Sequence, residues 1–156
     1  MKIVQNTSNF SVKDETYVTI GTFDGVHFGH QKIIEKLVKE AKKANKKSVV
    51  LTFFPHPRMV LQKDASLKLL NTIEERATLL EKTDLDYLII HPFSKDFSRM
   101  SALEFVRDIL VKQLNISKLI IGYDHHFGKN REGNITQLSE YSHLYGFKVE
   151  EIPAQD

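Results

Sequence analysis

The 156-residue chain contains no cysteine and no tryptophan. The absence of cysteine excludes a disulfide framework, a thiol nucleophile and a cysteine-ligated zinc site. Long apolar runs are lacking too, because the best candidate, residues 49–54, falls far short of the roughly 20 residues that a membrane-spanning helix needs. The opening MKIVQNTSNF lacks the apolar stretch of a secretory signal. We therefore expect a soluble, cytoplasmic protein without a membrane partner.

Neither sign of charge is in large excess, since 22 Lys and Arg residues oppose 20 Asp and Glu residues. An apolar content of 41% with 27% charged residues is ordinary for a folded globular protein and excludes wholesale disorder. The length suffices for one core that folds without disulfides. We therefore interpret residues 1–156 as one domain.

One stretch concentrates positive charge, with seven lysines in residues 32–47: Lys32, Lys36, Lys39, Lys42, Lys43, Lys46 and Lys47. Such a cluster can form a patch for nucleic acid or polyphosphate. No arginine or aromatic residue is interspersed, and the helix dipole favours cations near a helix C-terminus. We favour a solvated helix face and expect no nucleic-acid partner.

Short β-branched runs bounded by turn residues predict strands, and one run that alternates in polarity predicts a strand nearer an edge. The buried runs are 17–20, 48–53, 87–90 and 118–122, and the alternating run is 147–152. Helical patterns separate these strands. The alternation predicts an α/β fold, with three α/β/α layers and a mostly parallel, Rossmann-like sheet.

Capping residues and apolar stripes locate the helices. Thr72-x-x-Glu75 and Ser101-x-x-Glu104 are capping-box patterns. Gly146 is placed to end a last short helix. The apolar residues expected to face the core are Ile33, Ile34, Leu37, Val38, Ala41, then Ile73, Ala77, Leu80, then Leu103, Val106, Leu110, and finally Leu138, Tyr141 and Tyr145.

Two connections, 55–71 and 91–100, are long for a compact domain, which is typical of functional loops. Both follow predicted strands, and ligands of open parallel sheets bind outside the carboxyl ends of strands. Pro55 and Pro57 restrict the backbone around His56 at such an end. We therefore expect the site at this edge.

The segment 21–30, GTFDGVHFGH, joins the first predicted strand to the first predicted helix. Its glycines allow a sharp turn close to a ligand, and the following helix start offers unpaired N–H groups to an anion. His27 and His30 are one helical turn apart, so both can face one bound group. The pattern fits neither a dinucleotide-binding loop nor a P-loop. It favours a transferase that stabilises charge on a polyphosphate.

These residues resemble the H-x-G-H signature of the nucleotidyltransferase superfamily, and Phe-Asp-Gly-Val-His within them resembles the FMN adenylyltransferase (FAD synthetase) module of bacterial bifunctional riboflavin kinase/FAD synthetases. Three further segments resemble the same family: 52–57 (TFFPHP), 92–97 (PFSKDF) and 122–128 (GYDHHFG). Many family members carry an acidic residue where this chain has Phe54, and His125 replaces an aromatic residue. The resemblance extends from residue 1 to about residue 152.

The resemblance implies adenylyl transfer from ATP to FMN, giving FAD and pyrophosphate, with Mg²⁺ as cofactor. It implies His27 and His30 as catalytic residues. For ATP it implies Gly21, Thr22, Phe23, Asp24, His27, Gly29 and His30, and for the flavin Pro55, His56, Pro57, Tyr123, Asp124 and Phe127. Asp124 is also the candidate metal ligand, because Mg²⁺ prefers carboxylate oxygens. Each of Phe54, Tyr123 and Phe127 can either stack on a flavin or belong to the core.

The resemblance departs from the family pattern at its end. No Ser/Thr-Ser-Ser-x-x-Arg string, which helps the family to bind the triphosphate, occurs in residues 1–156, and these residues contain no riboflavin kinase module. We expect a truncated chain whose parent carries that module, and weak activity at best.

Two alternatives stay open. One is a related nucleotidyltransferase with another phosphorylated acceptor, and the other is a non-catalytic nucleotide- or metal-binding module. A structural zinc site is disfavoured, since the side chains of adjacent histidines such as His125 and His126 point in opposite directions in an extended segment.

Overall fold

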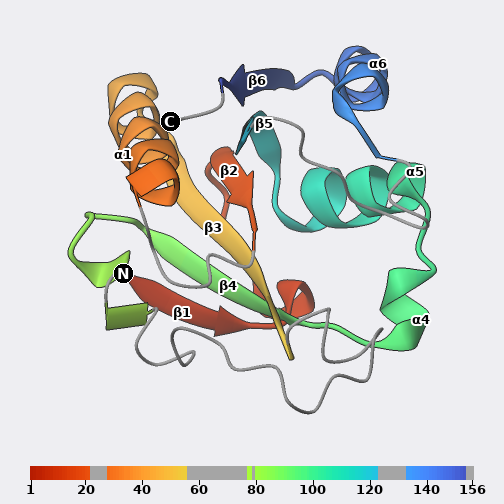
Figure 1. The fold of residues 1–156 in the computed structure, drawn as a ribbon, viewed down its shortest axis with the longest axis horizontal. Helices are drawn as coiled ribbons and strands as arrows, with labels where there is room; N and C mark the ends of the chain where they lie inside the picture. Colours follow the sequence, from red (N-terminus) through yellow and green to blue (C-terminus); the bar gives the residue numbers. More distant parts are fainter. Residues whose placement is uncertain (22–27, 56–76, 79, 123–132, 154–156) are drawn as a thin grey trace.

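The computed structural model describes residues 1–21, 28–55, 77–78, 80–122 and 133–153 (Figure 1). Six strands in this part form one sheet of order β1-β4-β3-β2-β5-β6, and each pairing between them is parallel. The strands are β1 (Lys2–Gln5), β2 (Thr16–Ile20), β3 (Lys47–Phe54), β4 (Tyr87–Pro92), β5 (Ile116–Gly122) and β6 (Lys148–Ile152). The helices are η1 (Thr7–Asn9), α1 (Phe28–Ala44), α4 (Lys95–Ser98), α5 (Ala102–Glu104), the π-helical η2 (Phe105–Gln113) and α6 (Ile135–Tyr145).

The five predicted strands are confirmed, and β6 lies at an edge as its alternating sequence indicated. The sheet order is that of a Rossmann-like fold with β1 added beyond β4. The sequence analysis did not identify β1. Three of its four residues are exposed, so it has no buried apolar face that a pattern could reveal. Its pairing with β4 decides that it is a strand.

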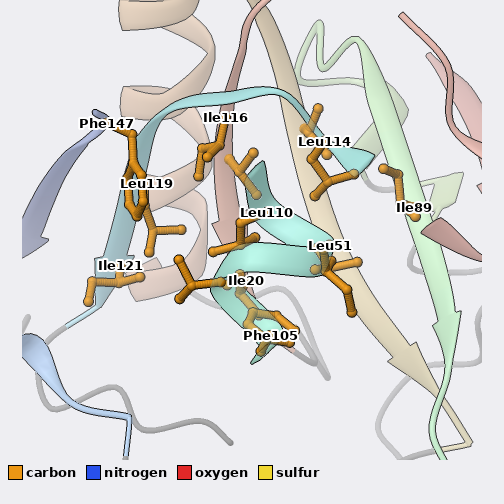
Figure 2. Packing of buried hydrophobic residues seen from close by; sticks show 14 of the residues in the cluster. Ile20, Leu51, Ile89, Phe105, Leu110, Leu114, Ile116, Leu119, Ile121 and Phe147 are labelled. Carbon is orange, nitrogen blue, oxygen red and sulfur yellow. The ribbon is translucent and has the colours of Figure 1, made fainter. Parts of the chain in front are cut away.

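Helices cover both faces of the sheet, which confirms the three layers. On one face, Ile34, Leu37 and Val38 of α1 pack with residues of β3 and β4. On the other face, Phe105 and Leu110 of η2 and Leu114, which directly follows η2, lie against side chains from the strands (Figure 2). The strand residues labelled there are Ile20, Leu51, Ile89, Ile116, Leu119 and Ile121.

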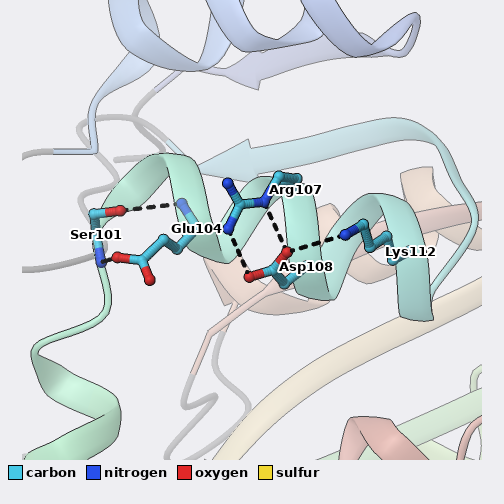
Figure 3. A network of polar contacts seen from close by, with 5 residues as sticks. All are labelled: Ser101, Glu104, Arg107, Asp108 and Lys112. Atoms are coloured by element: carbon cyan, nitrogen blue, oxygen red, sulfur yellow. Dashed lines mark hydrogen bonds and ion pairs between the residues drawn. The ribbon is translucent and has the colours of Figure 1, made fainter.

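The capping box at Ser101 is confirmed (Figure 3). The backbone N–H of Glu104 donates to Ser101 Oγ at 3.1 Å, and that of Ser101 donates to Glu104 Oε1 at 3.2 Å. The expectation that Leu103 faces the core is wrong, because its side chain is 36% exposed. Ala102 of α5 and Phe105 at the start of η2 are buried, and Phe105 packs in the core, whereas Leu103 lies on the exposed side of α5.

Figure 3 also shows a surface network that follows the cap. Arg107 donates to both carboxylate oxygens of Asp108, at 2.8 and 3.1 Å, and Lys112 lies 3.7 Å from the same group. Hydrogen bonding from Arg107 is the main reason why the pKa of Asp108 is lowered. Exposure of these side chains limits the contribution of the network to stability.

The remaining helix predictions have mixed outcomes. Gly146 ends α6 with φ of 75°, a left-handed conformation that glycine adopts without strain. Residues 77–78 and 80–81 are helical, and Ala77 and Leu80 are buried as predicted. Thr72, Ile73 and Glu75 lie outside the described residues. The segment 91–100 is not a plain loop, because β4 extends to Pro92 and α4 follows.

The lysine cluster lies along α1 and the turn after it. Lys36 forms ion pairs with Glu40 and Glu150, Lys42 with Asp84, and Lys46 with Glu15. These partners fit a solvated helix face. The expected absence of a nucleic-acid partner stays a prediction.

A second charge network joins α1 to β5 and β6. Lys118 is 16% exposed and donates to Glu40 and, at 2.8 Å, to Glu150. Burial lowers the pKa of Lys118, but hydrogen bonds to the two carboxylates outweigh it and the net pKa is raised. Burial raises the pKa of Glu150, yet hydrogen bonds from Lys118 and Lys36 leave its net pKa lowered.

We expect Glu150→Gln to lower the free energy of unfolding at pH 7 by about 1–2 kcal/mol, because a partly buried cation loses a charged hydrogen bond. A carboxylate with a lowered pKa stabilises the folded state above its ordinary value of 4.5, and this stabilisation disappears as the pH falls through the folded-state pKa. Urea unfolding at pH 7 and pH 3.5 tests this. Glu151→Gln, at an exposed neighbouring position, is the control. A difference between wild type and Glu150→Gln that is unchanged at pH 3.5 contradicts the expectation.

Candidate active site

The order of the strands predicts the edge of the sheet at which a ligand would bind. From β2 the chain proceeds to β3 and then β4 on one side, and it later adds β5 and β6 on the other side. The order therefore reverses between β2 and β5. In open α/β sheets, ligands bind outside the carboxyl ends of the strands at this switch point. Of the predicted site segments, 21–30 follows β2, 122–128 follows β5 and 52–57 spans the end of β3.

The carboxyl edge of the sheet has a step. Val18 pairs with Leu119, so the same register places Ile20, the last residue of β2, level with Ile121, one residue before the end of β5. Leu51 pairs with Ile20, but β3 continues to Phe54, which pairs with Pro92 of β4. Three further residues at about 3.3 Å each extend β3 by about 10 Å beyond β2. Figure 1 shows β3 and β4 running past the end of β2.

Three of the predicted ATP-binding residues lie among the described residues. The backbone N–H of Gly21, directly after β2, donates to the Leu51 carbonyl at 3.0 Å and fixes the start of the segment. Gly29 and His30 lie in the first turn of α1, which contains no acidic residue. The unpaired N–H groups and positive dipole end of such a helix start favour phosphate. Thr22, Phe23, Asp24 and His27 lie outside the described residues.

Gly122, the last residue of β5, lies directly against α1. A Cβ atom at this position would lie 3.3 Å from Ile33 Cδ1, so glycine allows the helix to approach the strand end closely. This contact brings α1, which follows β2, against the end of β5, the strand on the other side of the switch point. Tyr123, Asp124 and Phe127 follow in the chain and lie outside the described residues.

Pro55 follows β3 and is half-buried, whereas His56 and Pro57 lie outside the described residues. Phe54 is 51% exposed, which decides against a core role for this residue. The same question stays open for Tyr123 and Phe127. The sequence analysis left the burial of Phe54 open, because Phe54 directly follows the predicted buried run 48–53 and its exposure depends on what packs against the strand end.

An aromatic cluster supports the extended end of β3 on the face opposite α1. The Phe53 ring centroid lies 5.9 Å from that of Phe93 and 5.5 Å from that of Phe97, and the His91 and Phe97 centroids are 4.7 Å apart. Such edge-on and tilted ring pairs are favourable beyond the area that they bury. The cluster fixes the strand end that precedes Pro55.

His91 belongs to a polar network that the sequence analysis did not identify. The backbone N–H of Thr7 donates to His91 Nδ1 at 3.3 Å, and the Thr7 hydroxyl lies 3.1 Å from the same atom and donates to Gln113. Nδ1 therefore acts as an acceptor in the neutral ring. Burial lowers the pKa of His91. No neighbouring residues in sequence could indicate this, because Thr7 and Gln113 are distant along the chain.

We expect stability to fall as the pH drops below 6.5, the ordinary pKa of histidine. The folded state has the lower pKa and binds fewer protons, so acid favours unfolding by up to about 1.4 kcal/mol per pH unit from this residue. The measurement is urea unfolding of wild type and His91→Asn, which keeps an acceptor oxygen, from pH 7.5 to 5.5. The variant is expected to show the shallower dependence. If the stability of wild type and of His91→Asn depends on pH with the same slope, the expectation is contradicted. His143→Asn, at an exposed position, is the control.

A metal site is not found in the described part of the chain, where no three His, Asp or Glu side chains gather to hold an ion. The candidate ligand Asp124 lies outside that part. Within the same residues, no helix is long and apolar enough to cross a membrane.

Comparisons with known proteins agree with this architecture. The sequence model of the FAD synthetase family matches residues 9–156. The chain belongs to the FAD synthetase family. Two relatives, each named bifunctional riboflavin kinase/FMN adenylyltransferase, come from Buchnera aphidicola subsp. Schizaphis graminum and Escherichia coli K12. The first is 39% identical over 97% of this chain and the second 32% identical over 96%, and the matches cover 49% and 48% of those proteins.

Solved structures give the same fold. A protein from Streptococcus pneumoniae described as a macrolide-efflux protein superimposes on the whole chain with a TM-score of 0.87 at 25% identity, and 52% of that protein is covered. A pantoate-beta-alanine ligase from Francisella tularensis superimposes with a TM-score of 0.64 at 16% identity, with 68% of it covered, and shows the fold alone. This FAD synthetase family member spans about half the length of the curated relatives it matches.

Proposed function

We propose that the chain transfers the adenylyl group of ATP to the phosphate of FMN, giving FAD and pyrophosphate. The observation that carries the proposal is the match to the FAD synthetase family over residues 9–156. The names of the relatives support it, since they include FMN adenylyltransferase. The sheet supports it physically, because three of the four resembling segments, 21–30, 52–57 and 122–128, lie at the carboxyl ends of β2, β3 and β5, at the switch-point edge.

The proposed chemistry is an in-line displacement. A phosphate oxygen of FMN forms a bond to the α-phosphorus of ATP, and the bond from that phosphorus to the oxygen bridging the β-phosphate breaks. The electron pair leaves with pyrophosphate. The FMN phosphate is already an anion at pH 7, so the reaction needs positioning and charge stabilisation more than a strong base.

In this proposal His27 and His30 donate to the ATP phosphates at the start of α1. The bed for the nucleotide is formed by Gly21, Thr22, Phe23, Asp24 and Gly29. Adjacent polyphosphate favours the charged form of an imidazole, which strengthens these contacts. The flavin side is formed by Pro55, His56, Pro57, Tyr123, Asp124 and Phe127.

Magnesium is proposed to enter with ATP as its Mg²⁺ complex. Mg²⁺ prefers oxygen ligands and commonly combines one or two carboxylates with substrate phosphates. Asp124 is the proposed carboxylate, since it follows β5 at the switch point.

The test is incubation of the 156-residue chain with Mg²⁺–ATP and FMN, with FAD and pyrophosphate quantified separately. Equal amounts of both products are expected, at a slow rate. Nicotinate mononucleotide and phosphopantetheine replace FMN in parallel reactions. Pyrophosphate release with either of these but not with FMN would favour a related nucleotidyltransferase. Salt-dependent RNA binding, without any effect of ATP on the melting temperature, would instead favour a non-catalytic module.

Two wider assignments belong to the same proposal. The parent protein is proposed to carry a riboflavin kinase domain, since both relatives are named for that activity and extend to about twice this length. Such a kinase would supply FMN to this site. The cytoplasmic location expected from the sequence is part of this proposal as well.

A further inference from the structure

Four charged side chains form a closed ring between α1 and the sheet. Lys118 of β5 pairs with Glu40 and Glu150, and Lys36 pairs with the same two carboxylates. Lys36 and Glu40 belong to α1, and Glu150 belongs to β6. Lys36 Nζ lies 2.6 Å from Glu150 and 3.4 Å from Glu40, and Lys118 Nζ lies 2.8 Å from Glu150. The charges alternate around the ring and cancel. We call these four residues the charge ring.

The charge ring lies on the face of β5 that contacts α1. Side chains alternate along a strand, so Lys118, Ile120 and Gly122 lie on one face. Ile120 is completely buried in the core cluster that contains Ile34 and Leu37 of α1. Lys118 is therefore a cation in line with core residues, beneath the helix.

β5 contacts α1 at two places along the helix. Gly122 lies against Ile33 near the helix start, where an added Cβ atom would be 3.3 Å from Cδ1. Lys118 contacts Glu40 in the second half of the helix. Ile33 and Glu40 are about 10 Å apart along the helix, and Lys118 and Gly122 are about 13 Å apart along the strand. These similar lengths allow the helix and the strand to lie alongside each other between the two contacts.

The apolar stripe and the charge ring constrain α1 in different ways. Burial of apolar surface has no directional preference, and packed helices can slide by small amounts. Charged hydrogen bonds, in contrast, are short and directional. The Lys118 side chain is 16% exposed, and its Nζ also lies 5.8 Å from the ring centroid of Tyr17 in β2. Replacing such ion pairs by apolar residues is often neutral for stability, so the main effect of the charge ring is to fix where α1 lies.

α1 extends this constraint to its first turn. The helix is continuous from Phe28 to Ala44 and contains no proline, so its middle and its start move together. Its first turn contains Gly29 and His30, which are proposed to bind the ATP phosphates. The other element in the contact, β5, leads through Gly122 into the segment that contains Asp124. The charge ring therefore fixes the two sides of the switch point relative to each other.

We infer that Lys118 is a positioning residue for adenylyl transfer, which sets the start of α1 relative to the carboxyl end of β5 through its contacts with Glu40 and Glu150. The inference rests on the proposed function. Lys118 is the third residue of β5 and lies about 13 Å before the strand end. It therefore acts through α1 and not by contact with a substrate.

The test is Lys118→Met, which replaces the cation by an apolar side chain of similar length. Single-turnover FAD formation is measured at increasing concentrations of Mg²⁺–ATP. The limiting rate divided by the half-saturating concentration of Mg²⁺–ATP is expected to fall about tenfold or more, because small misplacements of reacting groups are costly. The Kd for FMN, measured by titration calorimetry, is expected to stay within about twofold of wild type. The charge ring does not involve β3, which leads into half of the proposed flavin side.

A double variant, Lys118→Met with Glu150→Leu, separates positioning from stability. Lys36 and Glu40 remain, one helical turn apart, and still neutralise each other. Apolar packing is expected to return the melting temperature to that of wild type, whereas the defect with ATP persists because α1 has lost its hydrogen bonds to the strands. Lys42→Met is the matched control, since it removes an exposed ion pair of the same helix with Asp84. It is expected to leave the dependence on ATP unchanged.

The outcomes separate the inference from the function. An unchanged dependence on ATP in folded Lys118→Met overturns the inference while the proposed function stands. If the double variant recovers both its melting temperature and its dependence on ATP, the inference is overturned as well, because Lys118 then acts through stability alone. Wild type that forms no FAD contradicts the proposed function itself, and the inference with it.

Discussion

His30→Ala is expected to lower the single-turnover rate of FAD formation about 100- to 1,000-fold, which is the usual cost of removing one donor aimed at developing charge. His30 lies in the first turn of α1, directly after the segment that leaves the end of β2. Its imidazole is the proposed donor to the ATP phosphates. Rapid-quench measurement of FAD, with enzyme in excess over ATP, records even slow transfer by the 156-residue chain.

The control for this variant is His143→Ala, because His143 lies in the last turn of α6 and is exposed. It is expected to leave the rate unchanged. Melting temperatures of both variants should match wild type. If folded His30→Ala forms FAD at close to the wild-type rate, His30 is not a catalytic residue. The family assignment would then still stand, since it does not depend on this residue.

Leu119→Ala is expected to lower the free energy of unfolding by about 2–5 kcal/mol, through lost burial and the cavity left behind. Leu119 is completely buried in β5, the strand that joins β2 to β6. Figure 2 shows its side chain in the same cluster as Leu110 of η2 and Phe147, which directly precedes β6. Urea unfolding with unchanged m-values measures the loss.

Leu144→Ala removes the same atoms from a side chain that is 69% exposed, and its effect is expected to stay within about 0.5 kcal/mol. Leu119→Val provides a milder change if Leu119→Ala does not fold. A loss below about 1 kcal/mol for Leu119→Ala contradicts the packing described here, because a buried leucine cannot be truncated so cheaply in a well-packed core.

Local patterns predicted most of the fold. β3 and β5 are buried on both faces, so their residues form continuous apolar runs that stand out in the sequence. The Ser101–Glu104 cap and the glycine after α6 act within four residues, which is why short patterns located them. β1 was not predicted, since three of its four residues are exposed and it shows neither a continuous apolar run nor a buried alternating face.

Part of the candidate site could also be predicted from local patterns, and part could not. The segments after β2, β3 and β5 could be identified from their residues, because glycines, prolines and histidines are unusual together at strand ends. The His91–Thr7–Gln113 network could not, since it depends on three elements that only packing brings together. The role of Thr22, Asp24, His27, His56 and Asp124 stays a prediction.

The sequence by itself determined the class of fold, the order of the strands along the chain and the resemblance to FMN adenylyltransferases. These follow from periodicity and from motifs, which are local properties of the chain. Only the tertiary structure decided that β3 and β4 extend beyond β2, and that Phe54 is exposed there rather than buried. The reason is physical: register and exposure depend on which strands are neighbours and on what covers them, and neither is a property of a short segment.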